Sequence, residues 1–150
     1  MLRHIMPDIV KRQKICSLPG TATAFDAARA MQKANVAAVI VVDGEGKLQG
    51  IVTERDLTRR VMAKDLDAKK AALSGVMTKN PDTLAPSDTA RDALELMRTR
   101  SYRHLPVKEN GRVTAVVSVR DLYDAIKKDL EEDIQETKDF VFNDRYSATH

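Results

Sequence analysis

The sequence is poor in the residues that mark disulfide-rich proteins, membrane-spanning proteins and proteins that bind single-stranded nucleic acid by stacking. Cys16 is the only cysteine among 150 residues, which excludes an internal disulfide and favours a reducing, cytoplasmic compartment. Tryptophan is absent and aromatic residues make up 4%, so stacking platforms for single-stranded nucleic acid are scarce. No stretch approaches the ~18 apolar residues of a membrane helix, and the N-terminus lacks the apolar run of a secretory signal. We therefore expect a cytoplasmic protein without membrane contact.

The charge balance favours small anionic ligands over nucleic acid. The 25 basic residues exceed the 22 acidic ones only slightly, giving a formal net charge of +3. Basic and acidic residues are interleaved, and no basic run carries aromatics between its charges, so the pattern disfavours nucleic-acid binding. A mild positive excess still attracts small anions. The length and the 43% apolar content suit one compact domain or two small repeats.

The chain repeats itself with a period of about 66 residues. Phe25-Asp-Ala-Ala-Arg-Ala-Met31 matches Arg91-Asp-Ala-Leu-Glu-Leu-Met97, and the two methionines are 66 positions apart (97 − 31). Gly50-Ile-Val-Thr-Glu-Arg-Asp-Leu57 matches Ala115-Val-Val-Ser-Val-Arg-Asp-Leu122, now 65 positions apart (121 − 56). The one-residue change falls in a predicted turn, where insertions are tolerated. This placement indicates an internal duplication.

Each copy predicts a helix, a hairpin and a second helix. Apolar residues at i, i+3, i+4 and i+7 predict the first helix of each copy: Ala24, Ala27, Ala28 and Met31, then Ala90, Ala93, Leu94 and Met97. Two short β-branched runs around a Gly-rich turn follow in the first copy, and an Asn-Gly turn predicts the hairpin of the second. The second helix starts at Thr53 or Ser118, and a short strand precedes each first helix. We expect an α/β fold of two units.

One motif recurs at both strand-to-helix junctions. Thr53-x-Arg55-Asp56 and Ser118-x-Arg120-Asp121 each follow an apolar strand. The pattern is typical of a capping box, in which the hydroxyl caps the helix and the acid reaches back. It also suits a nucleotide, because free N–H groups and arginine bind phosphate and a carboxylate accepts two hydrogen bonds from a ribose diol. Capping and binding are compatible, and the residues leave both open.

The sequence resembles the cystathionine-β-synthase-type (CBS) domain pair, or Bateman module, in the form of a stand-alone bacterial-type signal-transduction protein. The resemblance rests on the duplication, on Gly50-Ile-Val-Thr-Glu-Arg-Asp-Leu57 and on Arg103-His-Leu-Pro-Val107. The resemblance runs from about Ile5-Met6 to about Ile126, and Val76-Met77 looks like a second copy of the opening Ile5-Met6. It implies tandem βαββα units in a pseudo-twofold pair, dimerised into a flat disc. It also implies AMP, ADP, ATP, NAD or S-adenosylmethionine in the clefts between the units.

The resemblance further implies a set of ligand contacts. Asp56 and Asp121 would hold ribose, and Thr53 and Ser118 would approach ribose or phosphate. The residues that would face phosphate or line the base pocket are Lys14, Ile15, Val36, Ala37, Ala38, Arg55, Met77, Tyr102, Arg103, His104, Pro106 and Arg120.

Three segments follow from this pattern: a first unit over 1–66 with an N-terminal lead-in, a second unit over 67–126, and a charged helix and polar tail over 127–150. Phe140, Phe142 and Tyr146 give that tail apolar content that suits either a partner or a loose end. The copies differ at two places. The opening methionine precedes the helix-capping threonine by 17 positions in the first (23 − 6) and 12 in the second (89 − 77), and Ala115 replaces Gly50.

Catalysis and metal binding are disfavoured. His4, His104 and His150 show no ligand spacing with Cys16 or with carboxylates. No phosphate-binding loop, dinucleotide fingerprint or nucleophile elbow is present. We therefore expect a non-enzymatic sensor of adenine nucleotides that acts as a homodimer on an unidentified partner protein. A ligand-free dimerisation scaffold and a nucleic-acid-binding CBS protein are the alternatives.

Overall fold

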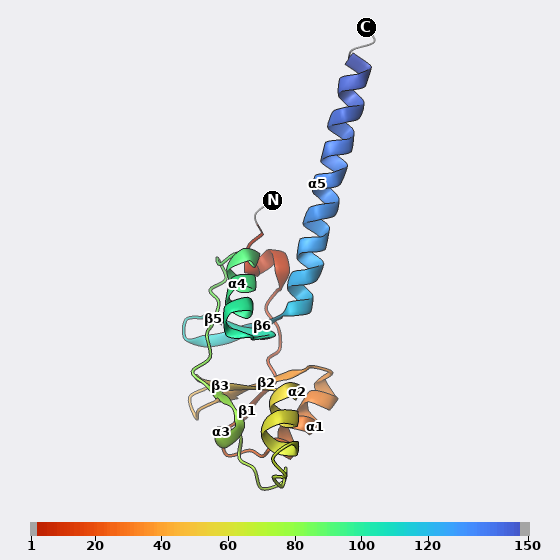
Figure 1. Ribbon diagram of the computed structural model, residues 1–150. Coiled ribbons are helices and arrows are strands. Elements are labelled where there is room, and N and C mark those ends of the chain that lie inside the picture. The colour runs from red at the N-terminus through yellow and green to blue at the C-terminus, as the bar shows by residue number, and fades with distance from the viewer. Residues whose placement is uncertain (1–2, 148–150) are drawn as a thin grey trace.

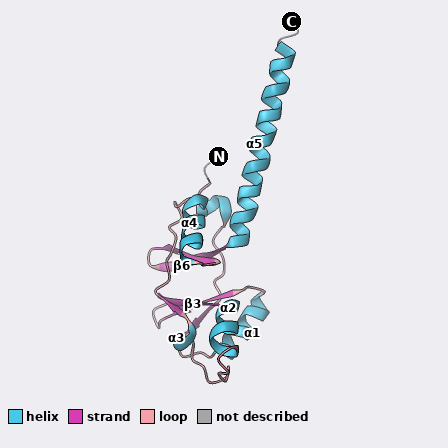
Figure 2. Cartoon of the chain, viewed as in Figure 1, coloured by secondary structure: helices cyan, strands magenta, loops and turns pink. Residues whose placement is uncertain are grey.

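Two β-sheets face each other across the middle of the molecule, with helices on their outer sides and one long helix projecting from one end (Figures 1 and 2). The computed structural model describes residues 3–147. The four-stranded sheet has the order β1-β2-β3-β4, with β1 over Ser17–Pro19, β2 over Ala38–Val42, β3 over Leu48–Thr53 and β4 over Thr78–Lys79. The two-stranded sheet pairs β5, His104–Glu109, with β6, Arg112–Ser118. The predicted two-unit α/β fold is confirmed.

The two hairpins correspond residue by residue. Strands β2 and β3 pair antiparallel with Val39 opposite Val52, and β5 and β6 pair with Leu105 opposite Val117. The turn of the second hairpin places both Asn110 and Gly111 at positive φ, 51° and 81°. These are the conformations for which an Asn-Gly pair is favoured at a hairpin turn.

The first helix of each unit begins at a threonine cap. Helix α1 runs over Ala24–Ala34 after Thr23, and α4 runs over Ala90–Arg100 after Thr89. Both caps are complete capping boxes. Ala27 and Ala93 are fully buried, whereas Ala28 and Leu94 are exposed. The predicted apolar face was therefore too wide, because each helix buries a narrow stripe against its sheet.

The second helices differ between the units. After β3, the short helix α2, Glu54–Asp56, passes directly into a π-helix, η2, over Leu57–Met62. After β6, α5 runs as one helix over Val119–Ser147. The predicted extended C-terminal helix is confirmed, and it continues through Ser147, so that Phe140, Phe142 and Tyr146 lie exposed on the helix rather than in a polar tail. Positions 148–150, with His150, lie outside the described residues.

The lead-in segment of each unit packs on the other unit. The backbone N–H of Ile5, in η1 (Ile5–Ile9), donates to the carbonyl of Asp88 at 2.7 Å, and that of Leu73, in α3 (Leu73–Val76), donates to the carbonyl of Ala22 at 2.8 Å. The two acceptors are 66 residues apart, so Ile5 is the equivalent of Leu73. Aligning Met6 with Met77 was therefore wrong. The true distances to the capping threonine are 18 residues (23 − 5) and 16 residues (89 − 73), which removes most of the expected difference.

The glycine that distinguishes the units is explained by strand β4. A Cβ atom at Gly50 would lie 2.5 Å from Sδ of Met77 and 2.8 Å from the carbonyl oxygen of Thr78, so only glycine fits beneath β4. The corresponding Ala115 of the second unit is fully buried in that unit's core.

Three apolar clusters hold these parts together. One contains η1 and the second unit, with Ile5, Leu84 and Leu105 fully buried, and another contains the first unit with Leu73. The third contains Ala38, Ile40 and Ile51 of the first sheet, packed against side chains that include Val113 and Val116 of the second. This third cluster joins the two sheets face to face.

A protein with the lead-in residue Ile5 replaced should unfold at a lower denaturant concentration than the wild type. We expect Ile5→Ala to lower the free energy of unfolding by about 2–5 kcal/mol, because Ile5 is fully buried and its loss leaves a cavity. Met62→Ala, at a side chain that is 80% exposed, should change it by less than about 0.5 kcal/mol. Urea unfolding of both variants measures the difference. Equal midpoints would contradict the packing of η1 on the second unit.

Candidate functional site

Strands β3 and β6 each end at a hydroxyl residue, which forms a helix cap with a carboxylate in the first turn of the next helix. Oδ2 of Asp56 accepts hydrogen bonds from Thr53 N at 2.9 Å and Thr53 Oγ1 at 3.2 Å, and Asp56 N donates to Thr53 Oγ1 at 3.3 Å. Oδ2 of Asp121 accepts from Ser118 N at 2.8 Å and Ser118 Oγ at 3.0 Å, and Asp121 N donates to Ser118 Oγ at 3.1 Å. The capping interpretation is confirmed at both junctions.

Capping alone does not distinguish these two junctions from others in the chain. The same box joins Thr23 to Asp26 and Thr89 to Asp92, at the outer helices. Asp56 and Asp121 differ from them because each lines a cleft between the two units. The cap also uses only one oxygen of each carboxylate, so the second oxygen can still accept a hydrogen bond.

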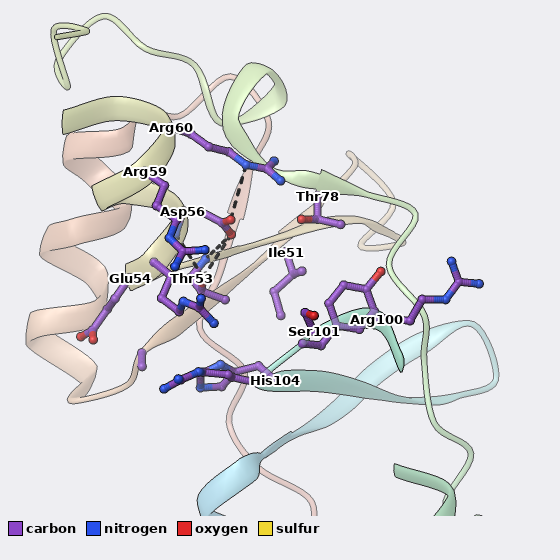
Figure 3. Close-up of a pocket in the computed structure, with 14 residues that line it drawn as sticks. Ile51, Thr53, Glu54, Asp56, Arg59, Arg60, Thr78, Arg100, Ser101 and His104 are labelled. Carbon is purple, nitrogen blue, oxygen red and sulfur yellow. Dashed lines mark hydrogen bonds and ion pairs between the residues drawn. The ribbon is translucent and has the colours of Figure 1, made fainter. Parts of the chain in front are cut away.

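The first cleft, of about 500 Å³, lies between the β3–α2 junction and the chain that enters β5 (Figure 3). Figure 3 shows Thr53 and Asp56 on one side and Ser101 and His104 on the other. Its lining is strongly charged and consists of Ala37, Ile51, Thr53, Glu54, Arg55, Asp56, Arg59, Arg60, Thr78, Arg100, Ser101, Tyr102, Arg103 and His104.

The second cleft, of about 610 Å³, is the counterpart of the first at the β6–α5 junction. It is bounded on the other side by the lead-in to β1 and by the chain that enters β2. Its lining is richer in apolar side chains and consists of Gln13, Lys14, Ile15, Cys16, Asn35, Val36, Ala37, Ala38, Arg103, His104, Val116, Ser118, Val119, Arg120 and Asp121.

The structure brings fourteen of the sixteen predicted site residues to these clefts, and their role in ligand binding stays a prediction. Those at the first cleft are Thr53, Arg55, Asp56 and Tyr102. Those at the second cleft are Lys14, Ile15, Val36, Ala38, Ser118, Arg120 and Asp121. Ala37, Arg103 and His104 line both.

Met77 and Pro106 line neither cleft. Met77 packs half-buried against the core of the first unit, where its sulfur lies beside Gly50 of β3, and its neighbour Thr78 lines the first cleft instead. Pro106 is fully buried within β5. Both were selected by position in a motif, which does not say whether a side chain points to a cleft or to a core.

Sequence reasoning missed several lining residues, above all arginines. Arg59 and Arg60 begin three residues after Asp56, and Arg100 ends the first helix of the other unit. The double arginine was a visible signal, but the second copy has no counterpart that would have drawn attention to it. Nε of Arg60 lies 3.6 Å from Oδ1 of Asp56, and its Nη1 donates to the carbonyls of Val76 and Met77.

His104 lies in the wall between the two clefts. Its Nδ1 atom is buried and has no hydrogen-bond partner among the described residues. Burial lowers the pKa of His104 below its ordinary value, and Arg103 lowers it further, whereas the carboxylates of Asp121, Glu54 and Asp56 raise it. The net direction is downward, so His104 is neutral at pH 7 and presents an uncharged imidazole to both clefts.

Other chemistry finds little support in the described part of the chain. No group of three or more His, Cys, Asp or Glu side chains within residues 3–147 is placed to hold a metal ion. Burial raises the pKa of the Cys16 thiol, which makes it a poorer nucleophile at neutral pH. None of the helices in the same residues has the length and apolarity that a bilayer crossing requires.

The fold and the paired junctions define a tandem-repeat α/β module, and comparison with known proteins identifies its family. The family model of the CBS domain matches residues 3–63 and again residues 73–128. The chain therefore belongs to the CBS-domain family, as the resemblance of the sequence suggested, and it carries two copies of the domain.

Relatives and solved structures agree with this assignment. The CBS domain-containing protein CBSCBSPB5 of Arabidopsis thaliana is 38% identical over 86% of this chain, which spans only 24% of that protein. A protein with CBS domains from Burkholderia ambifaria has a TM-score of 0.71 at 30% identity, covering 75% of this chain and 82% of that one. A CBS domain protein from Pyrobaculum aerophilum, solved in complex with AMP, has a TM-score of 0.68 at 30% identity, covering 75% and 86%.

The lowered pKa of His104 predicts a pH-dependent stability. Below about pH 6.5 the unfolded chain protonates this histidine while the folded protein resists, so stability falls as the pH drops from there toward the folded-state pKa. His104→Gln should flatten this part of the curve. The measurement is urea unfolding between pH 7.5 and pH 5, with His4→Gln as the control for loss of a histidine outside both clefts. Equal slopes in the wild type and His104→Gln would contradict the prediction.

Proposed function

We propose that this protein is a regulatory sensor that binds adenine nucleotides such as AMP, ADP, ATP or NAD in its two clefts and acts without catalysis. The observation that carries the proposal is the matched pair of junctions: two clefts, each with a capped helix, a hydroxyl and a carboxylate held in one orientation. A duplicated pocket of this kind is typical of a binding module, because equivalent carboxylates in separate clefts cannot share acid and base roles.

The proposed contacts divide the nucleotide into three parts. The carboxylates of Asp56 and Asp121 accept hydrogen bonds from ribose hydroxyls through the oxygen that the cap leaves free. Arg55, Arg103 and Arg120 donate to phosphate. The base lies against the apolar residues that enter each hairpin, such as Val36 and Tyr102. The AMP complex of the Pyrobaculum aerophilum protein supports an adenine ligand, because that chain is 30% identical to this one.

The proposed output is a change in how a homodimer presents its outer faces to a partner protein in the cytoplasm. A ligand shifts a conformation only if it prefers one state over another, and a site between two units meets this requirement because closing the units alters both walls. The exposed apolar residues Leu130, Ile134 and Val141 of α5 support a self-association surface. Since the chain spans about a quarter of its Arabidopsis relatives, any further activity of a longer protein is outside this proposal.

Adenine nucleotides should stabilise the protein against heat. A ligand at one hundred times its Kd adds about 2.7 kcal/mol, which raises the melting temperature of a domain of this size by roughly 5–10 °C. The measurement is a thermal shift with AMP, ADP, ATP, NAD and S-adenosylmethionine, together with mass spectrometry of the ligand that co-purifies. A protein that is dimeric by light scattering but shifts with none of them would be a scaffold, which is the alternative function.

Removing a cleft carboxylate should weaken binding more than it weakens the fold. We expect Asp56→Ala or Asp121→Ala to weaken nucleotide binding at its own cleft roughly tenfold to hundredfold, since a hydrogen bond to a charged group contributes about 1.5–3 kcal/mol. Asp26→Ala is the matched control, because it removes the same capping box at an outer helix. Isothermal titration gives the dissociation constants. If both cleft variants bind as tightly as Asp26→Ala, the assignment of the site fails.

A further inference from the structure

The π-helix η2 is a difference between the two units that lies directly beside the first cleft. Its backbone bonds span five residues, as in the 2.8 Å bond from Ala63 N to the carbonyl of Thr58. In α5 the buried residues after β6 are Leu122 and Ala125, three residues apart, whereas beside the first cleft half-buried Leu57 and buried Val61 pack on the core four residues apart. The π-turn therefore places one more residue between its two inward-facing positions than α5 does.

Two arginines of η2 face the first cleft. Arg59 and Arg60 occupy the space between the core contacts and both line that cleft, as Figure 3 shows. At the 65-residue offset of the two Arg-Asp-Leu motifs, the corresponding residues of α5 are Asp124 and Ala125, and neither lines the second cleft. An aspartate and an alanine thus stand in one unit where two arginines stand in the other.

The arginines give the two clefts different charge and chemistry. The first cleft contains five arginines, Arg55, Arg59, Arg60, Arg100 and Arg103, against the carboxylates of Glu54 and Asp56. Arg60 is held by Asp56, and Arg100 lies 3.6 Å from Asp82, whereas no ion pair joins Arg55, Arg59 or Arg103 to another described residue.

The second cleft has a different balance. Only two arginines line it, Arg103 and Arg120, together with Lys14. The position of Glu54 is taken by Val119, and Ile15, Val36 and Val116 add to an apolar wall. This lining offers more contact to a base and fewer bidentate donors to phosphate than the first cleft does.

We propose that the clefts are specialised: the first takes an adenosine di- or triphosphate through Arg59 and its neighbours, and the second takes an adenosine ligand with one phosphate or none. This rests on the proposed function. A polyphosphate chain carries several negative charges, which need several guanidinium groups at different points, and the π-turn supplies these only at the first cleft. An adenosine ligand with little charge gains more from the apolar wall of the second cleft.

The test separates the clefts by silencing one at a time. In an Asp121→Ala background, titration calorimetry reports on the first cleft, and ATP should bind at least tenfold more tightly than AMP. In an Asp56→Ala background it reports on the second cleft, and AMP should bind at least as tightly as ATP. Inorganic tripolyphosphate should compete with ATP in the first background only. The reverse preference in the two backgrounds would overturn the proposal.

Arg59→Ala then tests the residue that carries the proposal. In the Asp121→Ala background it should lower the ratio of ATP to AMP affinity about tenfold, the change expected from one charge-assisted contact. Arg91→Ala, which removes an exposed arginine outside both clefts, should keep the ratio. Equal ratios in the two variants would overturn the specialisation while leaving the nucleotide sensor intact. Failure of the wild type to bind any adenine nucleotide would instead overturn the sensor, and the specialisation with it.

Discussion

Neither sheet can bury its apolar inner face within its own unit, and the rest of the structure depends on this constraint. Ala38, Ile40 and Ile51 are covered by side chains of the opposite sheet, which fixes the two hairpins face to face. The lead-in helices η1 and α3 also connect the two units, because each packs into the core of the other unit. The clefts lie where this packing stops. Strand ends there carry Thr53 and Ser118, whose hydroxyls are satisfied by the caps.

On the proposed function, capping and ligand binding use the same carboxylates without conflict. The cap fixes the side chain of Asp56 or Asp121 by bonds to one oxygen, so the remaining oxygen has a defined direction before any ligand arrives. A group fixed in advance loses less conformational entropy on binding than a free one. The same capping box occurs at Asp26 and Asp92 of the outer helices, so the box is a feature of the fold and not only of the clefts. On the proposed function, the position of the inner caps between the units is what makes them useful for recognition.

Features that occur in both copies could be predicted from the sequence, whereas features that occur in only one copy were missed. Both hairpins, both helix caps and most of the cleft lining followed from matching the copies, because each signal appeared twice. Met77 and Pro106 were misplaced because a motif gives the order of residues along a strand but not which neighbour covers them. The exchange of lead-ins and the continuation of α5 through Tyr146 depend on tertiary contacts and helix length. The double arginine is visible in the sequence, but no local pattern in 3.6-residue periodicity reports a π-turn or shows that Arg59 faces the cleft.

The duplication gives the two clefts the same arrangement of strands and helices. This shared arrangement limits the positions at which the residues of the two clefts can differ. Positions such as Ala27 and Ala93, or Val52 and Val117, are buried in both units, so a change there would cost stability before it altered binding. The helix that follows each cap is freer, because its exposed positions, such as Arg59 and Asp124, pack in neither core. Arg59 and Arg60 stand there where the second unit has Asp124 and Ala125, which changes the charge of a cleft while Val61 and Leu122 stay buried. On the proposed function, a pair with one frame and two unequal pockets can respond to the ratio of two nucleotides, since each ligand acts on the same interface from its own side.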